Sequence, residues 1–175
     1  MKYNEQKGSH LNLQEEFEVT PMEFVKVAEF LSNGEFAPRL IEKPGSIPKL
    51  EGVLLGEDRD KAAENVGWVF HKGSKLQMGA LQSLGVNKLR VCYPLSPFTS
   101  ITVAAIISRS KLWNKEIEDE AEGWVVDHIA EYFWKTVEEE DNGLRRMMNA
   151  SSTLRKSVFE KLAENGKMGM AGVND

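Results

Sequence analysis

The sequence predicts a mostly helical α+β fold, in which about five helices pack on a small antiparallel hairpin. Apolar side chains recur every three or four residues over 114–140, which is typical of one long amphipathic helix. Alternating apolar and polar residues over 88–93, followed by the β-branched run 100–107, favour two strands joined by a loop. We therefore expect the helices to cover one face of a two-stranded sheet.

The first expected helix runs over residues 20–33. Thr20 can accept a hydrogen bond from a backbone N–H of the first turn, and Pro21 stands where a missing N–H costs nothing. Gly34 suits the left-handed turn that closes many helices. The residue types at both ends therefore agree on one helix with these limits.

Proline and glycine are frequent in residues 35–56, so no regular helix is expected there. Short extended pieces at 39–41 and 52–55 are the secondary structure that this segment predicts. A connection of this length inside one domain usually packs on the surface or serves a purpose. We therefore expect these residues to form a surface arm of the domain.

Two further helices are expected before the hairpin. Residues 58–72 have acidic side chains near their beginning and basic side chains near their end, which the helix dipole favours. Gly73 is expected to end this helix. The next residues, 74–85, begin with a capping-box pattern and predict a short helix that Gly85 ends.

The expected hairpin consists of two segments with different patterns. The segment 88–93 alternates in polarity, which predicts a half-buried strand. The segment 100–107 is apolar and rich in β-branched residues, which favours a second, antiparallel strand. A buried helix is the alternative for this second segment, because Ser96 would cap it and Pro97 would occupy its first position.

The long helix 114–140 has an apolar, aromatic face that includes His128. Trp134 lies about 100° further round the helix than Phe133, and so falls off this face. Two interpretations of Trp134 stay open: an exposed anchor of a protein interface, or a core residue that another element covers. The last residues oppose the helix dipole and should fray its end; they are Glu138, Glu139, Glu140 and Asp141.

Two shorter elements are expected near the end of the chain. Residues 144–148 predict a helical turn, and 152–165 predict a last helix that begins at a serine cap. A chain of 175 residues is long enough for one domain with its own core. We expect that domain to span 11–166, with flexible termini at 1–10 and 167–175.

Composition and charge exclude several classes of protein. A net charge of -5 disfavours general binding to the phosphates of nucleic acids. The longest apolar run is far shorter than the roughly 20 residues that span a bilayer, and no signal peptide is visible. Cys92 is the only cysteine, so no intramolecular disulfide can form. The sequence therefore predicts a soluble, cytoplasmic protein without a membrane partner.

No pattern of residues predicts a catalytic, metal or cofactor site. His128 lies between Asp127 and Glu131, but His-x-x-Glu reverses the Glu-x-x-His order of metal sites in helical bundles, and no second copy exists. A core or boundary position is therefore the preferred interpretation of His128. Cys92 would need a nearby base to act as a nucleophile, and a small buried residue is the preferred interpretation there too.

The missing catalytic pattern and the acidic charge favour a small acidic intracellular protein-binding module. Its expected partner is another protein with a basic surface, which it would regulate or inhibit, as proteins from phages and mobile elements often do. Trp134 and the acidic block 138–141 are the expected binding residues. An assembly subunit that forms homo-oligomers is the first alternative. An enzyme is the second, with a site built from scattered residues, namely His71, Arg90, His128 and one of the acids.

Overall fold

The computed structural model describes residues 21–112, 115–138 and 142–166. The expected flexible termini, 1–10 and 167–175, lie outside the described residues. The described part is mostly helical with a two-stranded antiparallel sheet, which confirms the predicted fold class. In chain order its elements are α2 (Pro21–Asn33), β1 (Leu40–Ile41), β2 (Lys49–Leu50), α3 (Glu57–Lys75), α4 (Gly79–Val91), α5 (Pro97–Ser108), α6 (Lys115–Glu138), α7 (Asn142–Ala150) and α8 (Ser152–Glu164).

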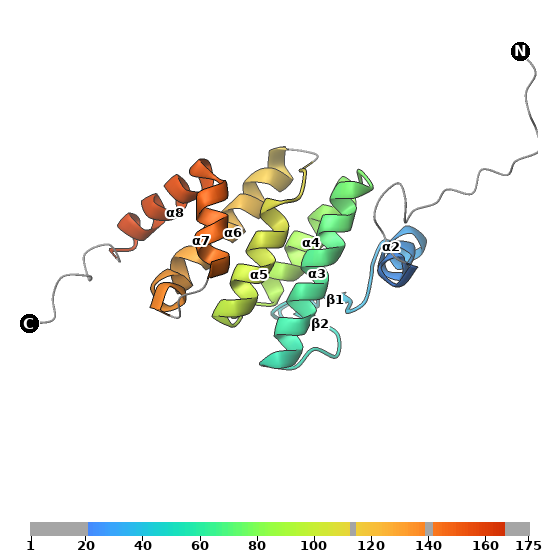
Figure 1. Cartoon of the computed structure of the whole chain (residues 1–175). Coiled ribbons are helices and arrows are strands. Elements are labelled where there is room, and N and C mark those ends of the chain that lie inside the picture. The colour runs from blue at the N-terminus through green and yellow to red at the C-terminus, as the bar shows by residue number, and fades with distance from the viewer. Residues whose placement is uncertain (1–20, 113–114, 139–141, 167–175) are drawn as a thin grey trace, which may run out of the picture.

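Six of the described helices form three helical hairpins that stack side by side in two layers (Figure 1). One layer holds α3, α5 and α7, and the other holds α4, α6 and α8. The pairs bury their apolar faces against one another, as helix pairs do in α-solenoids. α2 and the small sheet lie at the end of the stack that α3 and α4 form. The middle helix of the second layer, α6, contacts α4, α5 and α8.

The sheet is not where the sequence placed it. β1 pairs with β2 inside the proline-rich arm, with Leu40 opposite Leu50 and Ile41 opposite Lys49. The expected extended piece at 39–41 is thus confirmed, whereas the one at 52–55 is wrong. The expected strands 88–93 and 100–107 are also wrong, because both segments are helical over most of their length.

The first mistaken strand results from a buried lysine. Lys88 has no solvent exposure, although the alternating pattern assigned it to a solvent face. The buried positions of α4 include Leu81, Gly85 and Leu89 together with Lys88, which is helical spacing. A lysine is rarely buried unless it is paired, so the sequence pattern favoured the wrong period.

The second mistaken strand results from the central position of α5. This helix packs between α3, α6 and α7, so it is apolar on several sides and shows no amphipathic period. Ser96 accepts a hydrogen bond from the Thr99 N–H at 3.2 Å, and Pro97 is the first helical residue. The alternative that the sequence left open for 100–107, a capped and buried helix, is therefore correct.

Two glycines that were expected to end helices lie inside them instead. A Cβ atom on Gly73 would lie 3.1 Å from Gln82 Cγ, and one on Gly85 would lie 3.2 Å from Phe70 Cβ. Both glycines therefore let α3 and α4 approach closely. As a result α3 continues to Lys75 and α4 continues to Val91.

The later helices agree better with the sequence. The long helix is confirmed over the described residues 115–138, and the last helix over 152–164. Residues 142–150 form a full helix rather than the expected single turn. One apolar core runs through all the helices, from Val27 to Leu162. Among the described helices, none combines the length and apolar composition that a bilayer crossing requires.

Candidate functional site

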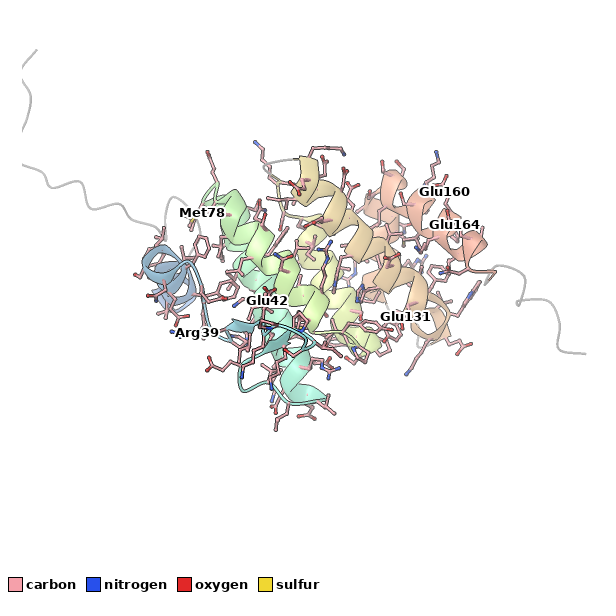
Figure 2. All side chains as sticks on the ribbon, turned by 180° about the vertical axis from the view of Figure 1, so that it is seen from behind. Arg39, Glu42, Met78, Glu131, Glu160 and Glu164 are labelled. Atoms are coloured by element: carbon pink, nitrogen blue, oxygen red, sulfur yellow. The ribbon has the colours of Figure 1, made fainter. Side chains whose placement is uncertain are left out.

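The outer side of α6 carries a row of acidic side chains. Its members recur at spacings that place them on one side of a helix, and all are exposed or partly exposed. Figure 2 views the molecule from behind, with α6 lying across the middle and Glu131 labelled. We call this surface the acidic face; it consists of Glu116, Asp119, Glu120, Asp127, Glu131 and Glu138.

Trp134 lies on the same side of α6, three residues after Glu131 and four before Glu138. Its side chain is 39% exposed, so the interpretation of a core residue covered by another element is not supported. The ring stands edge-on against the buried Phe133, with the centroids 5.2 Å apart. Phe133 in turn contacts Phe159 of α8, so the indole rests on a packed aromatic base.

The expected acidic block is described only at its first residue. Glu138 is exposed at the end of α6. Glu139, Glu140 and Asp141 lie outside the described residues. Their role in binding therefore stays a prediction, and Trp134 and Glu138 are the expected binding residues that the structure places on one helix side.

Helices on both sides of α6 contribute basic residues to this surface. Arg90 of α4 lies 3.4 Å from the Glu120 carboxylate, and Lys161 of α8 lies 2.8 Å from that of Asp127. The hydrogen bond to Asp127 raises the pKa of Lys161. Exposed ion pairs of this kind contribute little to stability. A basic partner can therefore compete with Arg90 and Lys161 for these carboxylates.

A surface hollow of about 550 Å³ opens between α4 and α6, next to the acidic face. Its size is within the range of ligand sites in proteins. A Cβ atom on Gly123 would meet nothing within 4 Å, so this glycine leaves open space in the lining. The lining consists of Arg90, Tyr93, Asp119, Glu120, Gly123, Trp124, Asp127 and His128.

Two stacked rings form the buried part of this lining. The rings of Trp124 and His128 are nearly parallel, with centroids 4.0 Å apart, and the residues are only 5% and 8% exposed. His128 Nδ1 lies 2.8 Å from the Trp124 carbonyl oxygen. A carbonyl oxygen only accepts, so Nδ1 carries the hydrogen and Nε2 of the neutral ring is an acceptor. Burial lowers the pKa of His128, which favours this neutral form.

The stacked pair also has two polar atoms without a partner. Neither His128 Nε2 nor Trp124 Nε1 makes a hydrogen bond to any described residue, although both are buried. One is an acceptor and the other a donor. Buried polar atoms are nearly always satisfied in native proteins, so this pair needs a water molecule or a ligand.

Tyr93 borders the hollow from the end of α4. Its ring is nearly perpendicular to that of His128, with centroids 5.6 Å apart, and is 48% exposed. The Tyr93 hydroxyl donates a hydrogen bond to Glu131 at 2.8 Å, which raises the pKa of Tyr93. This bond links the hollow to the acidic face.

The residues that an enzyme would need converge only in part. Arg90 and His128 line the same hollow, whereas His71 does not; its Nδ1 lies 2.9 Å from the Ser110 hydroxyl. Cys92 is buried, and burial raises its pKa to about 12, so its thiol is a poor nucleophile. Within the described ranges, no group of three or more His, Cys, Asp or Glu residues could hold a metal ion.

Sequence reasoning did not single out five residues of the hollow, which are Tyr93, Asp119, Glu120, Gly123 and Trp124. A glycine in the middle of a long helix was the available signal, because such a residue often has a packing or functional reason. Comparisons with family models, with curated proteins and with solved structures found no match for this chain. Its function therefore has to be inferred from the geometry of the acidic face and the hollow.

Proposed function

We propose that this chain is a protein-binding module that docks onto the basic surface of a partner protein. The observation that carries the proposal is an exposed indole, Trp134, set among the carboxylates of the acidic face. Tryptophan is a favoured anchor of protein interfaces, and carboxylates steer a protein toward a basic partner. By covering such a surface, the module would act as a regulator or inhibitor of that partner.

The position of α6 supports this role. It is the middle helix of its layer, so the helices on either side flank the acidic face without covering it. Its 24 residues give a rod about 36 Å long. A stable interface buries about 800 Å² on each partner. A surface built on α6 and the edges of its two neighbours has suitable dimensions for this.

The experiment is affinity capture from the native host, followed by affinity measurement with the purified partner. The variant carries Trp134→Ala together with charge reversal of residues 138–141. The matched control is Trp68→Ala, which removes an indole of similar exposure, 48%, from α3 in the other layer. We expect the variant to lose the partner and the control to retain it.

Three other results would contradict docking through the acidic face of α6. If the Trp134→Ala variant with reversed charges binds the partner as tightly as the Trp68→Ala control does, α6 is not the docking surface. Capture of further copies of this chain alone would favour an assembly subunit. Release of a captured protein on mutation of Trp68 rather than Trp134 would move the interface to the layer that contains α3.

A further inference from the structure

We infer that the hollow beside Gly123 binds the guanidinium group of an arginine on the partner, an inference that rests on the proposed function. The hollow adjoins the acidic face, and Glu120 and Asp127 belong to both surfaces. A partner that docks on α6 therefore has a basic residue within reach of the hollow. Charge, hydrogen bonding and ring contacts each point to the same group.

The charge of the lining favours a cation. Three carboxylates line the hollow, against one guanidinium, and that guanidinium is already paired with Glu120. Lys115 and Lys161 reach Asp119 and Asp127 from outside the lining, as exposed pairs. Such pairs are weak, so an incoming cation can compete with them.

The unsatisfied nitrogens specify the hydrogen bonds of the ligand. His128 Nε2 is a buried acceptor and requires an N–H donor, which a guanidinium supplies. Trp124 Nε1 is a buried donor and requires an acceptor. A peptide carbonyl next to the arginine supplies that acceptor, whereas a free amine or guanidine does not. This second requirement favours an arginine within a polypeptide over a small free cation.

The rings distinguish a guanidinium from an ammonium group. Tyr93 presents a half-exposed aromatic ring at the edge of the hollow. A guanidinium stacks on aromatic rings, pairs with carboxylates through two N–H groups and is less strongly hydrated than an ammonium.

The test is a nuclear magnetic resonance titration of the full chain labelled with ¹⁵N-histidine. The probe is the peptide acetyl-Gly-Arg-Gly-amide, and its citrulline counterpart is the neutral control of the same shape. The arginine peptide should shift the His128 Nε2 signal and leave that of His71 in place, because His71 lies outside the hollow. The citrulline peptide should shift neither signal.

Substitutions at two lining residues, each with a matched control, test the location of the site. Gly123→Leu places a side chain in open space within the hollow and suits a helix, so the protein should fold while the site is filled. Ala150→Leu adds the same side chain to an exposed position of α7 and is the matched control. We expect Gly123→Leu to weaken arginine-peptide binding by about tenfold or more. Tyr93→Ala should weaken it as well, whereas Tyr93→Phe keeps the ring and should bind.

The possible results separate this inference from the proposed function. An unchanged His128 signal at saturating arginine peptide would mean that water alone satisfies the two nitrogens. Agmatine that binds more tightly than the peptide would overturn the assignment to a polypeptide. Partner capture that needs Trp134 but survives Gly123→Leu would overturn only the arginine site. Arginine-peptide binding together with capture that ignores Trp134 would overturn only the docking proposal.

Discussion

Lys88 of α4 is fully buried, and its ammonium group lies 2.5 Å from the carboxylate of Glu35 in the segment after α2. The same group donates hydrogen bonds to the carbonyl oxygens of Phe36 and Pro38 and lies 3.7 Å from the centre of the Phe36 ring. Burial lowers the pKa of Lys88, and the hydrogen bond to Glu35 opposes that change. One buried cation therefore fastens the segment after α2 to the helical stack.

Replacing Lys88 with methionine should destabilise the protein by about 3 kcal/mol, because a carboxylate and two carbonyl oxygens would lose a buried partner. Urea denaturation measures this loss. Lys61→Met on the exposed side of α3 is the matched control and should cost little. Equal losses in the two variants would mean that the buried contacts of Lys88 are not needed for stability.

The same lysine explains how far the sequence could predict the fold. Amphipathic periods located the long helix and the last helix well, because each has one buried face. Lys88 hides the helical pattern of α4, because it is a charged residue at a buried position. Its partner Glu35, which makes that burial possible, lies more than fifty residues earlier in the chain. An ion pair between residues so far apart leaves no pattern in the local sequence, so the 88–93 part of α4 was predicted as a strand.

Two glycines should respond to alanine in opposite directions. Gly123→Ala adds a methyl group to open space in a helix and should raise stability by about 0.5–1 kcal/mol. Gly85→Ala places its Cβ 3.2 Å from the Cβ of the fully buried Phe70, which cannot withdraw without moving α3. We expect a net loss of about 1 kcal/mol there, because overpacking outweighs helix propensity. Thermal or urea unfolding of both variants checks the two signs, and a gain at both positions would contradict the close approach of α3 and α4.

The candidate site was predictable only where it depends on a single helix. The position of Trp134 off the apolar face and the acidic residues near it follow from spacing along α6. The hollow needs Arg90 and Tyr93 to meet His128, and this depends on how α4 packs against α6. Because the sequence pattern of 88–93 favours a strand, it does not predict that Arg90 and Tyr93 lie next to His128.

The free energy of unfolding should decrease as the pH is lowered, and His128 should account for part of that decrease. Burial holds the pKa of His128 below its ordinary value of 6.5. The hydrogen bond to the Trp124 carbonyl oxygen opposes that change, and so do the charges of Glu131 and Asp127. Above pH 6.5 both the folded and unfolded forms are neutral at this residue, so its full contribution is present. Below pH 6.5 the unfolded chain binds a proton that the folded chain resists, and stability falls by at most about 1.4 kcal/mol per pH unit.

The measurement is the free energy of unfolding between pH 7.5 and 5, in the wild type and in His128→Gln. Carboxylates also titrate toward the lower end of this range, but they are common to both proteins, so the difference between the two slopes belongs to His128. The wild type should have the steeper slope. Parallel slopes would show that His128 accepts its proton as readily in the folded chain as in the unfolded one.

Salt should separate the two parts of the proposed docking surface. Ions screen the attraction between the acidic face and a basic partner, with a Debye length of about 10 Å at 0.1 M salt and about 3 Å at 1 M. Glu116→Gln with Glu138→Gln should therefore lower both the affinity and its dependence on salt. Trp134→Ala should lower the affinity but leave the salt dependence intact, because the indole contributes apolar contact.

Glu51→Gln with Glu57→Gln removes two exposed charges outside α6 and should change neither quantity. Both values come from the affinity of the captured partner for each variant, measured over a series of salt concentrations. If the control substitutions lower the salt dependence as much as the α6 substitutions do, net charge rather than the acidic face attracts the partner.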